Sequence, residues 1–292
     1  MKQKHITIIA VCLLLAILLL TALDSRLRIV TYEISSEKIP APVRLAVLTD
    51  LHSCDYGEGQ RDLLDAVAAQ NPDAVALVGD IVDDVLPEEN AWTAVSALAA
   101  EWPCFYVTGN HEWWSGDAER ICRQMEALGV QVLRGDQVTA DLNGQQITFC
   151  GIDDPDSGSS TQQLLQLETR EKENNFTVFL AHRPEEIDSY LNGSFDLILS
   201  GHAHGGQWRI PGILNGLYAP NQGLFPAYAG GEYGLDGTVF LVSRGLARES
   251  THSPDLQPAG SGNCGHRAGE PVSVFVPQKR RKCRKFVCAT LP

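Results

Sequence analysis

One pattern recurs along this chain: a short apolar run ends abruptly in a polar cluster that contains Asp, Asn or His. The apolar runs 45–48, 74–78, 105–107, 178–180 and 197–199 are followed by Asp50, Asp80, Asn110, His182 and His202. Short continuous apolar runs are typical of strands that are buried on both faces, so helices must cover the sheet. Helical candidates lie between the runs at 63–69, 91–100 and 118–128. The pattern predicts an α/β fold with functional groups at the strand ends.

Seven side chains in these clusters are of types that bind metal ions: Asp50, His52, Asp80, Asn110, His182, His202 and His204. Taken singly, each has an ordinary structural explanation, and a lone His182, for example, fits a hydrogen-bonded core histidine. Taken together, they lie at or just after strand ends, with glycines where tight turns are needed. This convergence favours a metal site with these seven ligands.

The types of ligand restrict the kind of metal. Neutral imidazole and carboxylate suit manganese, zinc or iron, whereas magnesium and calcium sites use oxygen ligands almost exclusively. We therefore expect two divalent transition-metal ions, with their identity left open. A shared carboxylate would hold the ions ~3.5–4 Å apart and turn a bridging water into a hydroxide nucleophile. No serine or cysteine nucleophile is then required.

The motifs that carry the ligands occur in the order DLH at 50–52, GDIVD at 79–83, GNHE at 109–112, AH at 181–182 and GHAH at 201–204. In this order they resemble the five-part signature of the calcineurin-like metallophosphoesterase superfamily. The resemblance covers most of residues 43–245. It implies an α/β fold in the form of a four-layer α/β/β/α sandwich, and an enzyme that cleaves phosphoester bonds.

The resemblance also implies a role for each ligand. One metal would be held by Asp50, His52, Asp80 and His204. The other would be held by Asp80, Asn110, His182 and His202, so that Asp80 bridges the pair. His111 would be the catalytic residue over the substrate, where it stabilises charge or protonates the leaving group.

Longer motifs narrow the branch of the superfamily. Asp83 stands where purple acid phosphatases carry a tyrosine ligand, which argues against an iron-tyrosinate centre. Phosphoprotein phosphatases have an Arg-Gly pair after this position, and its absence here argues against protein phosphatase activity. The stretches GNHEWW, GIDDP, LAHRP, SGHAHGGQ and VSRGL are similar to the bacterial membrane-anchored phosphohydrolase branch. That similarity implies a phosphodiesterase, pyrophosphohydrolase or phosphatase acting on a phosphorylated small-molecule or lipid-linked substrate, near a membrane or in the cell envelope.

Several further residues are candidates for supporting roles. Arg244 follows a predicted strand and could contact a substrate phosphate, with a structural salt bridge as the alternative. Trp113 and Trp114 could line a hydrophobic substrate groove, although core packing is the commoner fate of tryptophan. Three carboxylates could orient the ligand histidines from outside the metal site: Asp83, Asp153 and Asp154.

The N-terminus is expected to lie outside the globular fold. Lys2 and Lys4 precede an almost unbroken apolar run at 6–22, which is near the length that a bilayer span needs. We expect residues 1–23 to form an uncleaved anchor, with a removed secretory signal as the alternative. The expected protein is thus a single-pass membrane protein with an extracytoplasmic catalytic domain. Residues 24–40 would form a stalk, and residues 41–250 the metallophosphoesterase domain.

The C-terminal tail, residues 251–292, differs in composition from the rest of the chain. Residues 253–271 are rich in Gly, Pro and Ser, and residues 279–285 are strongly basic. A neighbouring reading frame over 254–271 permits a string that resembles the last strand of the branch. The ordinary explanation is a disordered C-terminal extension with a charged end. The alternative hypothesis is that a frameshift has replaced the native strand and left a sheet edge unpaired.

Two other functions remain as alternatives. A nuclease would share the metal site but needs a basic track for the nucleic-acid backbone, and the formal net charge of −13 argues against nucleic acid as a partner. A catalytically inactive binding protein tethered to a membrane would have lost a metal ligand. All seven are present, so the sequence favours the hydrolase.

Overall fold

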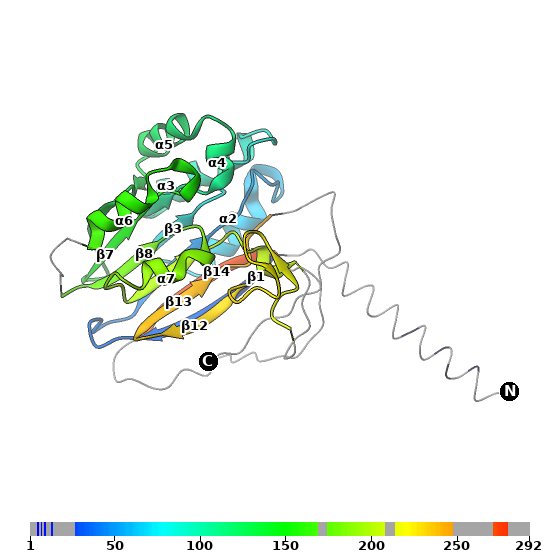
Figure 1. The fold of residues 1–292 in the computed structure, drawn as a ribbon. Helices are drawn as coiled ribbons and strands as arrows, with labels where there is room; N and C mark the ends of the chain where they lie inside the picture. The colour runs from blue at the N-terminus through cyan, green and yellow to red at the C-terminus, as the bar shows by residue number, and fades with distance from the viewer. Residues whose placement is uncertain are drawn as a thin grey trace.

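The computed structural model describes residues 27–168, 174–207, 214–247 and 271–279, together with the isolated positions 5, 7, 9 and 13. Two six-stranded sheets form the centre of the molecule (Figure 1). The first sheet has the strand order β1 (Leu27–Ser35), β14 (Pro271–Lys279), β2 (Val43–Leu48), β3 (Ala74–Val78), β4 (Cys104–Val107) and β5 (Gln131–Val132). All neighbours in it are parallel except β1, which pairs antiparallel with β14.

The second sheet also has a parallel centre, but it has an antiparallel strand at each edge. Its strand order is β12 (Gly231–Leu235), β13 (Thr238–Val242), β9 (Leu197–Ser200), β8 (Phe176–Leu180), β7 (Gln145–Gly151) and β6 (Asp136–Leu142). β12 and β6 are the antiparallel edge strands. A short hairpin of β10 (Tyr218–Ala219) and β11 (Gly223–Leu224) lies apart from both sheets.

Apolar side chains on the facing surfaces of the two sheets form the central core. Leu45 and Val47 of β2 pack in one cluster with Phe149 of β7 and Leu199 of β9. Phe105 of β4 stacks on Phe149, with ring centroids 3.8 Å apart. Burial of this surface on both sides explains why the strands have continuous apolar runs and no alternation.

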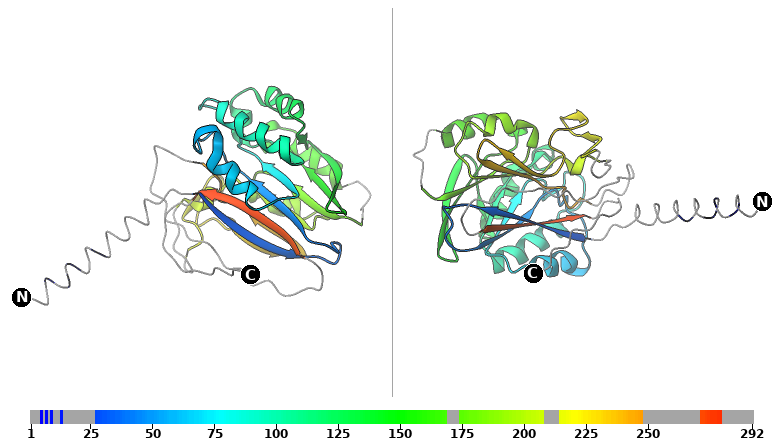
Figure 2. Two further views of the ribbon diagram at one scale, coloured as in Figure 1. Left: turned by 180° about the vertical axis from the view of Figure 1, so that it is seen from behind. Right: turned by 90° about the horizontal axis from the view of Figure 1, so that it is seen from below.

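Helices cover the outer face of each sheet (Figure 2). The other face of β2, β3 and β4 packs in one cluster with α2 (Arg61–Ala68), α3 (Glu89–Glu101) and α5 (Ala118–Ala127). The outer face of β8, β9 and β13 packs with α6 (Ser160–Glu168) and α7 (Ile187–Tyr190). The predicted mixed α/β fold with two sheets is confirmed, and α2, α3 and α5 coincide with the helices expected from the sequence.

The structure corrects the predicted single-pass membrane localisation. Across the part of the chain that it describes, no helix is both long enough and apolar enough to cross a bilayer. A span needs ~20 residues, whereas α3 has 13. The predicted anchor rested on residues 6–22, which lie outside the described residues apart from positions 7, 9 and 13.

The first sheet also differs from the expectation at both ends of the chain. β1 lies in the segment that was expected to be a stalk, and β14 lies in the segment that was expected to leave an edge unpaired. β14 instead occupies the place between β1 and β2, with Val274 and Phe275 buried. The expectation of an unpaired edge is therefore wrong. The remainder of the tail, 251–270 and 280–292, lies outside the described residues.

Candidate metal centre

The seven predicted ligands lie at the carboxyl ends of five parallel strands. Asp50 and His52 follow β2, Asp80 follows β3, Asn110 follows β4, His182 follows β8, and His202 and His204 follow β9. Asn110 also begins α4 (Asn110–Trp114), and His204 begins a single turn of 3₁₀-helix, η4 (His204–Gly206). Because these strand ends meet at one edge of the two sheets, residues far apart in the sequence come together.

Two groups of potential ligand atoms share Asp80. In the first, atoms of Asp50, His52, Asp80 and His204 all lie within 4.8 Å of one another. In the second, the same holds for Asp80, His182 and His202. The distance from Asp80 Oδ2 is 3.7 Å to His52 Nε2 and 3.0 Å to His182 Nε2. One carboxylate oxygen therefore faces both groups, as the predicted bridging role requires.

Buried ligand-type atoms in this cluster have no hydrogen-bond partner among the described residues. They are Asp50 Oδ2, His52 Nε2 and Asn110 Oδ1, together with Asp80 Oδ2 and His182 Nε2, which form an ion pair at 3.0 Å without hydrogen-bond geometry. A buried polar atom that lacks a partner is costly, so most such atoms in native proteins are satisfied. Carboxylate oxygens, imidazole nitrogens and an amide oxygen form a donor set that suits divalent transition metals. The residues present thus fit a metal centre.

The backbone adopts unfavourable conformations at most of these positions. The φ angles of Asp50, His52, Asp80, His202 and His204 are 51°, 48°, 53°, 61° and 44°. Non-glycine residues rarely adopt this left-handed region, and such strain gathers at functional sites. Backbone hydrogen bonds join the loops, among them Asp50 N to Gly79 O at 3.0 Å and His52 N to Asp80 O at 2.9 Å. These bonds hold the side chains in place against the strain.

Two glycines leave room for the aspartates. A Cβ atom at Gly109 would collide with the carboxylate of Asp80. At Gly201 a Cβ atom would lie 2.7 Å from Asp50 Oδ2. The glycines expected from the sequence for tight turns are therefore also required for space.

The electrostatics of the centre pair carboxylates with imidazoles. Burial lowers the pKa of His182, but the charges of Asp80 and Asp50 outweigh it and raise the pKa to about 10. Burial also lowers the pKa of His52, but the hydrogen bond to Asp83 and the charge of Asp80 outweigh it and raise this pKa to about 9. Burial raises the pKa of Asp80, but His182 holds it well below its usual value. The buried carboxylates thus draw positive charge into the site.

Hydrogen bonds fix the ring orientation of two of the predicted ligand histidines. His182 Nδ1 donates to Val78 O at 2.9 Å, and His52 Nδ1 donates to Asp83 Oδ2 at 3.0 Å. With Nδ1 as the donor, the neutral form of each ring presents the lone pair of Nε2 to the cluster. Asp83 therefore lies where a carboxylate that orients a ligand histidine was predicted.

The other two predicted carboxylates lie farther from the ligands. Asp153 accepts hydrogen bonds from Thr108 and Arg134. Asp154 binds the buried guanidinium of Arg183 through Oδ1 and Oδ2, at 3.0 Å and 2.7 Å. Arg183 Nη1 lies 3.4 Å from His202 Nε2, so Asp154 reaches that ligand through Arg183.

His111 lies beside the first group of ligands. Its ring centroid is 4.2 Å from that of His52, and the rings meet edge to face. Its Nδ1 atom is 2.6 Å from Asp84 Oδ1 and 3.6 Å from Asp83 Oδ2. Asp84 was not singled out from the sequence, because an aspartate next to Asp83 in a loop has no pattern that marks it.

Glu112 is a second residue that sequence reasoning missed. Its buried carboxylate accepts four backbone N–H groups: Asp80 at 3.0 Å, Ile81 at 2.8 Å, Val82 at 3.0 Å and Gly109 at 2.7 Å. Burial and the charge of Asp80 raise its pKa to about 7. The available signal was its place in the first turn of α4, where a glutamate caps the helix start.

Arg244 and the two tryptophans have distinct surroundings. Arg244 Nη2 donates to Gly230 O at 3.1 Å, so its guanidinium lies against backbone. Trp113 Nε1 donates to Thr108 Oγ1 at 2.9 Å, with the side chain half-buried. Trp114 is exposed, and its ring centroid lies 4.9 Å from that of His111. A contact of Arg244 with substrate phosphate stays a prediction.

Comparison with known proteins gives matches over the same region. The family described as calcineurin-like phosphoesterase matches residues 43–206, which is more than half of the chain. A metallophosphoesterase of Campylobacter jejuni is 28% identical over 188 residues, which cover 61% of this chain and 49% of that protein. The protein YpbG of Bacillus subtilis is 26% identical over 253 residues, covering 84% of this chain and 88% of YpbG. A 5'-nucleotidase precursor from Thermus thermophilus, 14% identical, superposes with a TM-score of 0.45 over 74% of this chain and 48% of that one.

Proposed function

The chain belongs to the calcineurin-like phosphoesterase family of metal-dependent phosphoric ester hydrolases, and from that premise we propose that it uses two divalent transition-metal ions bound by seven side chains. Asp50, His52, Asp80 and His204 would hold one ion. Asp80, Asn110, His182 and His202 would hold the other. The observation that carries the proposal is the position of Asp80 Oδ2, which faces both groups of ligand atoms.

When bound, the ions would lower the pKa of a water molecule and neutralise charge on the phosphoryl oxygens. The chain's own residues supply orientation and proton transfer. Asp83 and the Val78 carbonyl keep Nδ1 of His52 and His182 as hydrogen-bond donors, so both rings offer Nε2. The loops are fixed by backbone hydrogen bonds before the substrate arrives, which avoids the cost of ordering them during the reaction.

His111 is proposed as the catalytic residue that faces the leaving group. Asp84 accepts a hydrogen bond from Nδ1 of His111, which orients the ring and leaves Nε2 to the substrate. In this position His111 stabilises charge on the phosphoryl group or donates a proton to the leaving oxygen. Its partial exposure beside the buried His52 suits a group that meets the substrate.

The bond cleaved is proposed to be a phosphodiester, pyrophosphate or phosphomonoester bond of a phosphorylated small molecule. The experiment that tests this is a hydrolysis assay of the full chain with Mn²⁺, Zn²⁺ or Mg²⁺, using bis-p-nitrophenyl phosphate and p-nitrophenyl phosphate. We expect turnover that chelation abolishes and that Mn²⁺ or Zn²⁺ restores better than Mg²⁺. Asp80→Ala should remove it, because both ions lose a ligand. Full activity of the Asp80 variant would overturn the proposal.

A further inference from the structure

Large apolar side chains are exposed on three segments that adjoin the candidate metal centre. Val85 and Leu86 lie on the loop after Asp83, Trp114 lies on α4, and Leu224 and Phe225 lie on the β10–β11 hairpin; their exposed fractions are 82%, 47%, 57%, 67% and 65%. We call these five side chains the apolar rim. Scattered apolar residues are normal on any surface, whereas a group beside a reactive centre marks a binding surface.

Two parts of the apolar rim are joined directly to the centre. Val85 N and Leu86 N donate to Asp83 Oδ1 at 2.9 Å and 2.8 Å, while Oδ2 of the same carboxylate accepts from His52. The ring of Trp114 adjoins that of His111, and its Nε1 donates to Asp156 Oδ2 at 2.8 Å. These bonds hold both segments in fixed positions next to the residues proposed to bind metal and substrate.

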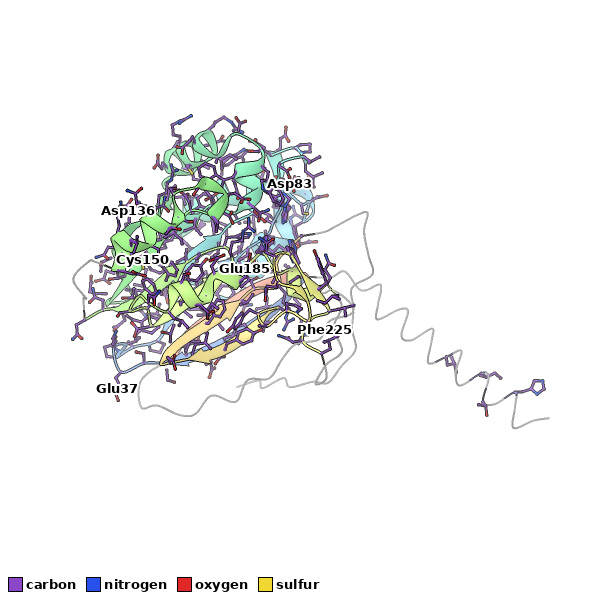
Figure 3. The ribbon with its side chains drawn as sticks, in the orientation of Figure 1. Glu37, Asp83, Asp136, Cys150, Glu185 and Phe225 are labelled. Atoms are coloured by element: carbon purple, nitrogen blue, oxygen red, sulfur yellow. The ribbon has the colours of Figure 1, made fainter. Side chains whose placement is uncertain are left out.

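The hairpin is joined to the loop that carries His204. Leu217 N donates to Gly206 O at 2.9 Å, and Phe225 N donates to Leu217 O at 2.8 Å. Phe225 has a φ angle of 58°, which a bulky residue rarely adopts. The hairpin therefore holds Phe225 in a strained conformation that leaves its ring exposed. Glu185 Oε1 lies 3.9 Å from His202 Nε2, and in Figure 3 Asp83 lies above Glu185 and Phe225 below it.

The charges near the apolar rim restrict what can bind there. Residues 83–89 include four carboxylates and no lysine or arginine: Asp83, Asp84, Glu88 and Glu89. Residues 214–231, which contain the hairpin, carry no charged side chain. Positive charge for one phosphoryl group would come from the metal pair. The nearby Arg120 is already paired with Glu88, so a second anionic group over these segments would meet carboxylates or uncharged side chains. An uncharged, apolar group fits them.

We propose that the apolar rim binds an uncharged, apolar ester group of the substrate. The substrate class is then a phosphoester with a single phosphoryl group that bears an alkyl or aryl arm. This inference rests on the proposed phosphoester hydrolysis and narrows its substrate class. The arm extends from the metal centre over the apolar rim, while the phosphoryl group faces the metal ligands.

The test is a series of alkyl p-nitrophenyl phosphate diesters, below micelle-forming concentrations, with the full chain and Mn²⁺. The alkyl groups are methyl, butyl, octyl, and butyl with a terminal carboxylate, and kcat/KM is measured from p-nitrophenolate release. A fully buried methylene changes an equilibrium by a factor of about four. An arm on this exposed surface is only partly buried, so we expect kcat/KM to rise at least about tenfold from methyl to octyl. The terminal carboxylate should lower kcat/KM for the butyl ester to the value of the methyl ester or below.

Variants on the two sides of the apolar rim test its role separately. The double variant Leu224→Ser/Phe225→Ser and the single variant Val85→Ser should each lower the ratio of kcat/KM for octyl over methyl. Leu165→Ser is the matched control, because Leu165 is also an exposed leucine and lies on α6, outside the segments of the apolar rim. The octyl-to-methyl ratio of kcat/KM for Leu165→Ser should equal that of the unmodified chain.

The possible failures are distinguishable. If metal-dependent hydrolysis is intact but kcat/KM does not change with alkyl length, the apolar-arm inference is overturned and the proposed function stands. The same conclusion follows if the variants of the apolar rim have the same octyl-to-methyl ratio of kcat/KM as the Leu165 control. Absence of metal-dependent hydrolysis for every ester overturns the proposed function itself.

Discussion

Glu112 holds the backbone of Asp80: Oε2 of the glutamate accepts the Asp80 N–H at 3.0 Å and the Gly109 N–H at 2.7 Å. One buried carboxylate thus joins the loop after β3 to the start of α4. Asp80 faces both groups of ligand atoms, and Asn110 is the residue after Gly109. The geometry of the metal centre therefore depends on a side chain that has no ligand role itself.

The first prediction concerns Glu112→Gln. The amide group would turn a donor toward backbone N–H groups that now have an acceptor, so we expect a loss of about 1–3 kcal/mol in the free energy of unfolding. Bound metal per chain should also fall. Urea denaturation and elemental analysis measure the two effects. Glu119→Gln, which removes an exposed partner of Arg134, is the control and should cost less than about 1 kcal/mol. Equal losses in both variants would contradict the role of Glu112.

The second prediction is that metal binding releases protons. In the metal-free chain the pKa of His52 is about 9 and that of His182 is about 10, so both rings are protonated at pH 7. A metal ion needs the neutral ring, and binding must displace each proton. We expect the affinity for Mn²⁺ to fall on the order of tenfold per pH unit for each proton displaced as the pH is lowered from 8 to 6. Calorimetry in buffers of different ionisation enthalpy counts the protons, and a count of zero would refute this expectation.

The third prediction concerns the stability of the metal-free chain. The folded pKa values of His52 and His182 lie above the ordinary value of 6.5. Groups of this kind contribute stability that is fully present below about pH 6.5 and is lost as the pH rises through about 9 and 10. The melting temperature of the metal-free chain should therefore fall between pH 7 and pH 10. The Mn²⁺-loaded chain is the control, and its melting temperature should fall less over the same pH range. If the melting temperatures of the two forms changed with pH in parallel, the effect could not be assigned to His52 and His182.

The fourth prediction separates His111 from the residue that positions it. His111→Ala should lower kcat by about 10²–10⁴-fold with bound metal retained, because proton transfer and charge stabilisation are lost. Asp84→Asn should lower kcat less with bound metal retained, since the ring keeps its place but loses a charged partner. Asp236→Asn, in the exposed turn between β12 and β13, is the control for the substitution type. A double variant His111→Ala/Asp84→Asn with a lower kcat than His111→Ala alone would show that Asp84 does not act through His111.

The strand ends were predictable because each buried strand and the polar residue at its end are neighbours in the sequence. The run 74–78, for example, is buried on both faces, and Asp80 follows shortly after it. β1 was not predictable, because it lies at the sheet edge and is only half-buried. Its apolar residues alternate between the two faces, with Leu27 and Ile29 on the outer side and Tyr32 and Ile34 facing the second sheet. Without a continuous apolar run, the segment resembled a stalk.

Glu112 and Asp84 escaped prediction for a different reason. Both act on groups about 30 residues away in the sequence: Glu112 on the backbone of Asp80, and Asp84 on the ring of His111. A pattern of residue types shows what a side chain can bind, but only the fold shows what it reaches. The seven candidate ligands could be identified from the sequence because they share one chemistry, whereas a single positioning carboxylate belongs to no such set.

The last prediction tests whether space at Gly109 is needed for the metal centre. Gly109 has a φ angle of −108° and a ψ angle of −173°, which is extended backbone that alanine adopts freely. Strain in the backbone would therefore not explain a defect in Gly109→Ala. The added Cβ would instead collide with the Asp80 carboxylate and with the Asp80 backbone nitrogen at 2.5 Å. Because Asp80 faces both groups of ligand atoms, we expect Gly109→Ala to lose bound metal and at least about 100-fold in kcat/KM.

Gly234→Ala is the matched control for this substitution. Gly234 lies in β12, and a Cβ atom there would have no heavy atom within 4 Å among the described residues. The control should keep its metal content, its activity and its melting temperature. If Gly109→Ala also kept two ions per chain, the Asp80 carboxylate would have to move without loss of the ions. Its observed position would then not be the one that binds them, and the bridging role would fail with it.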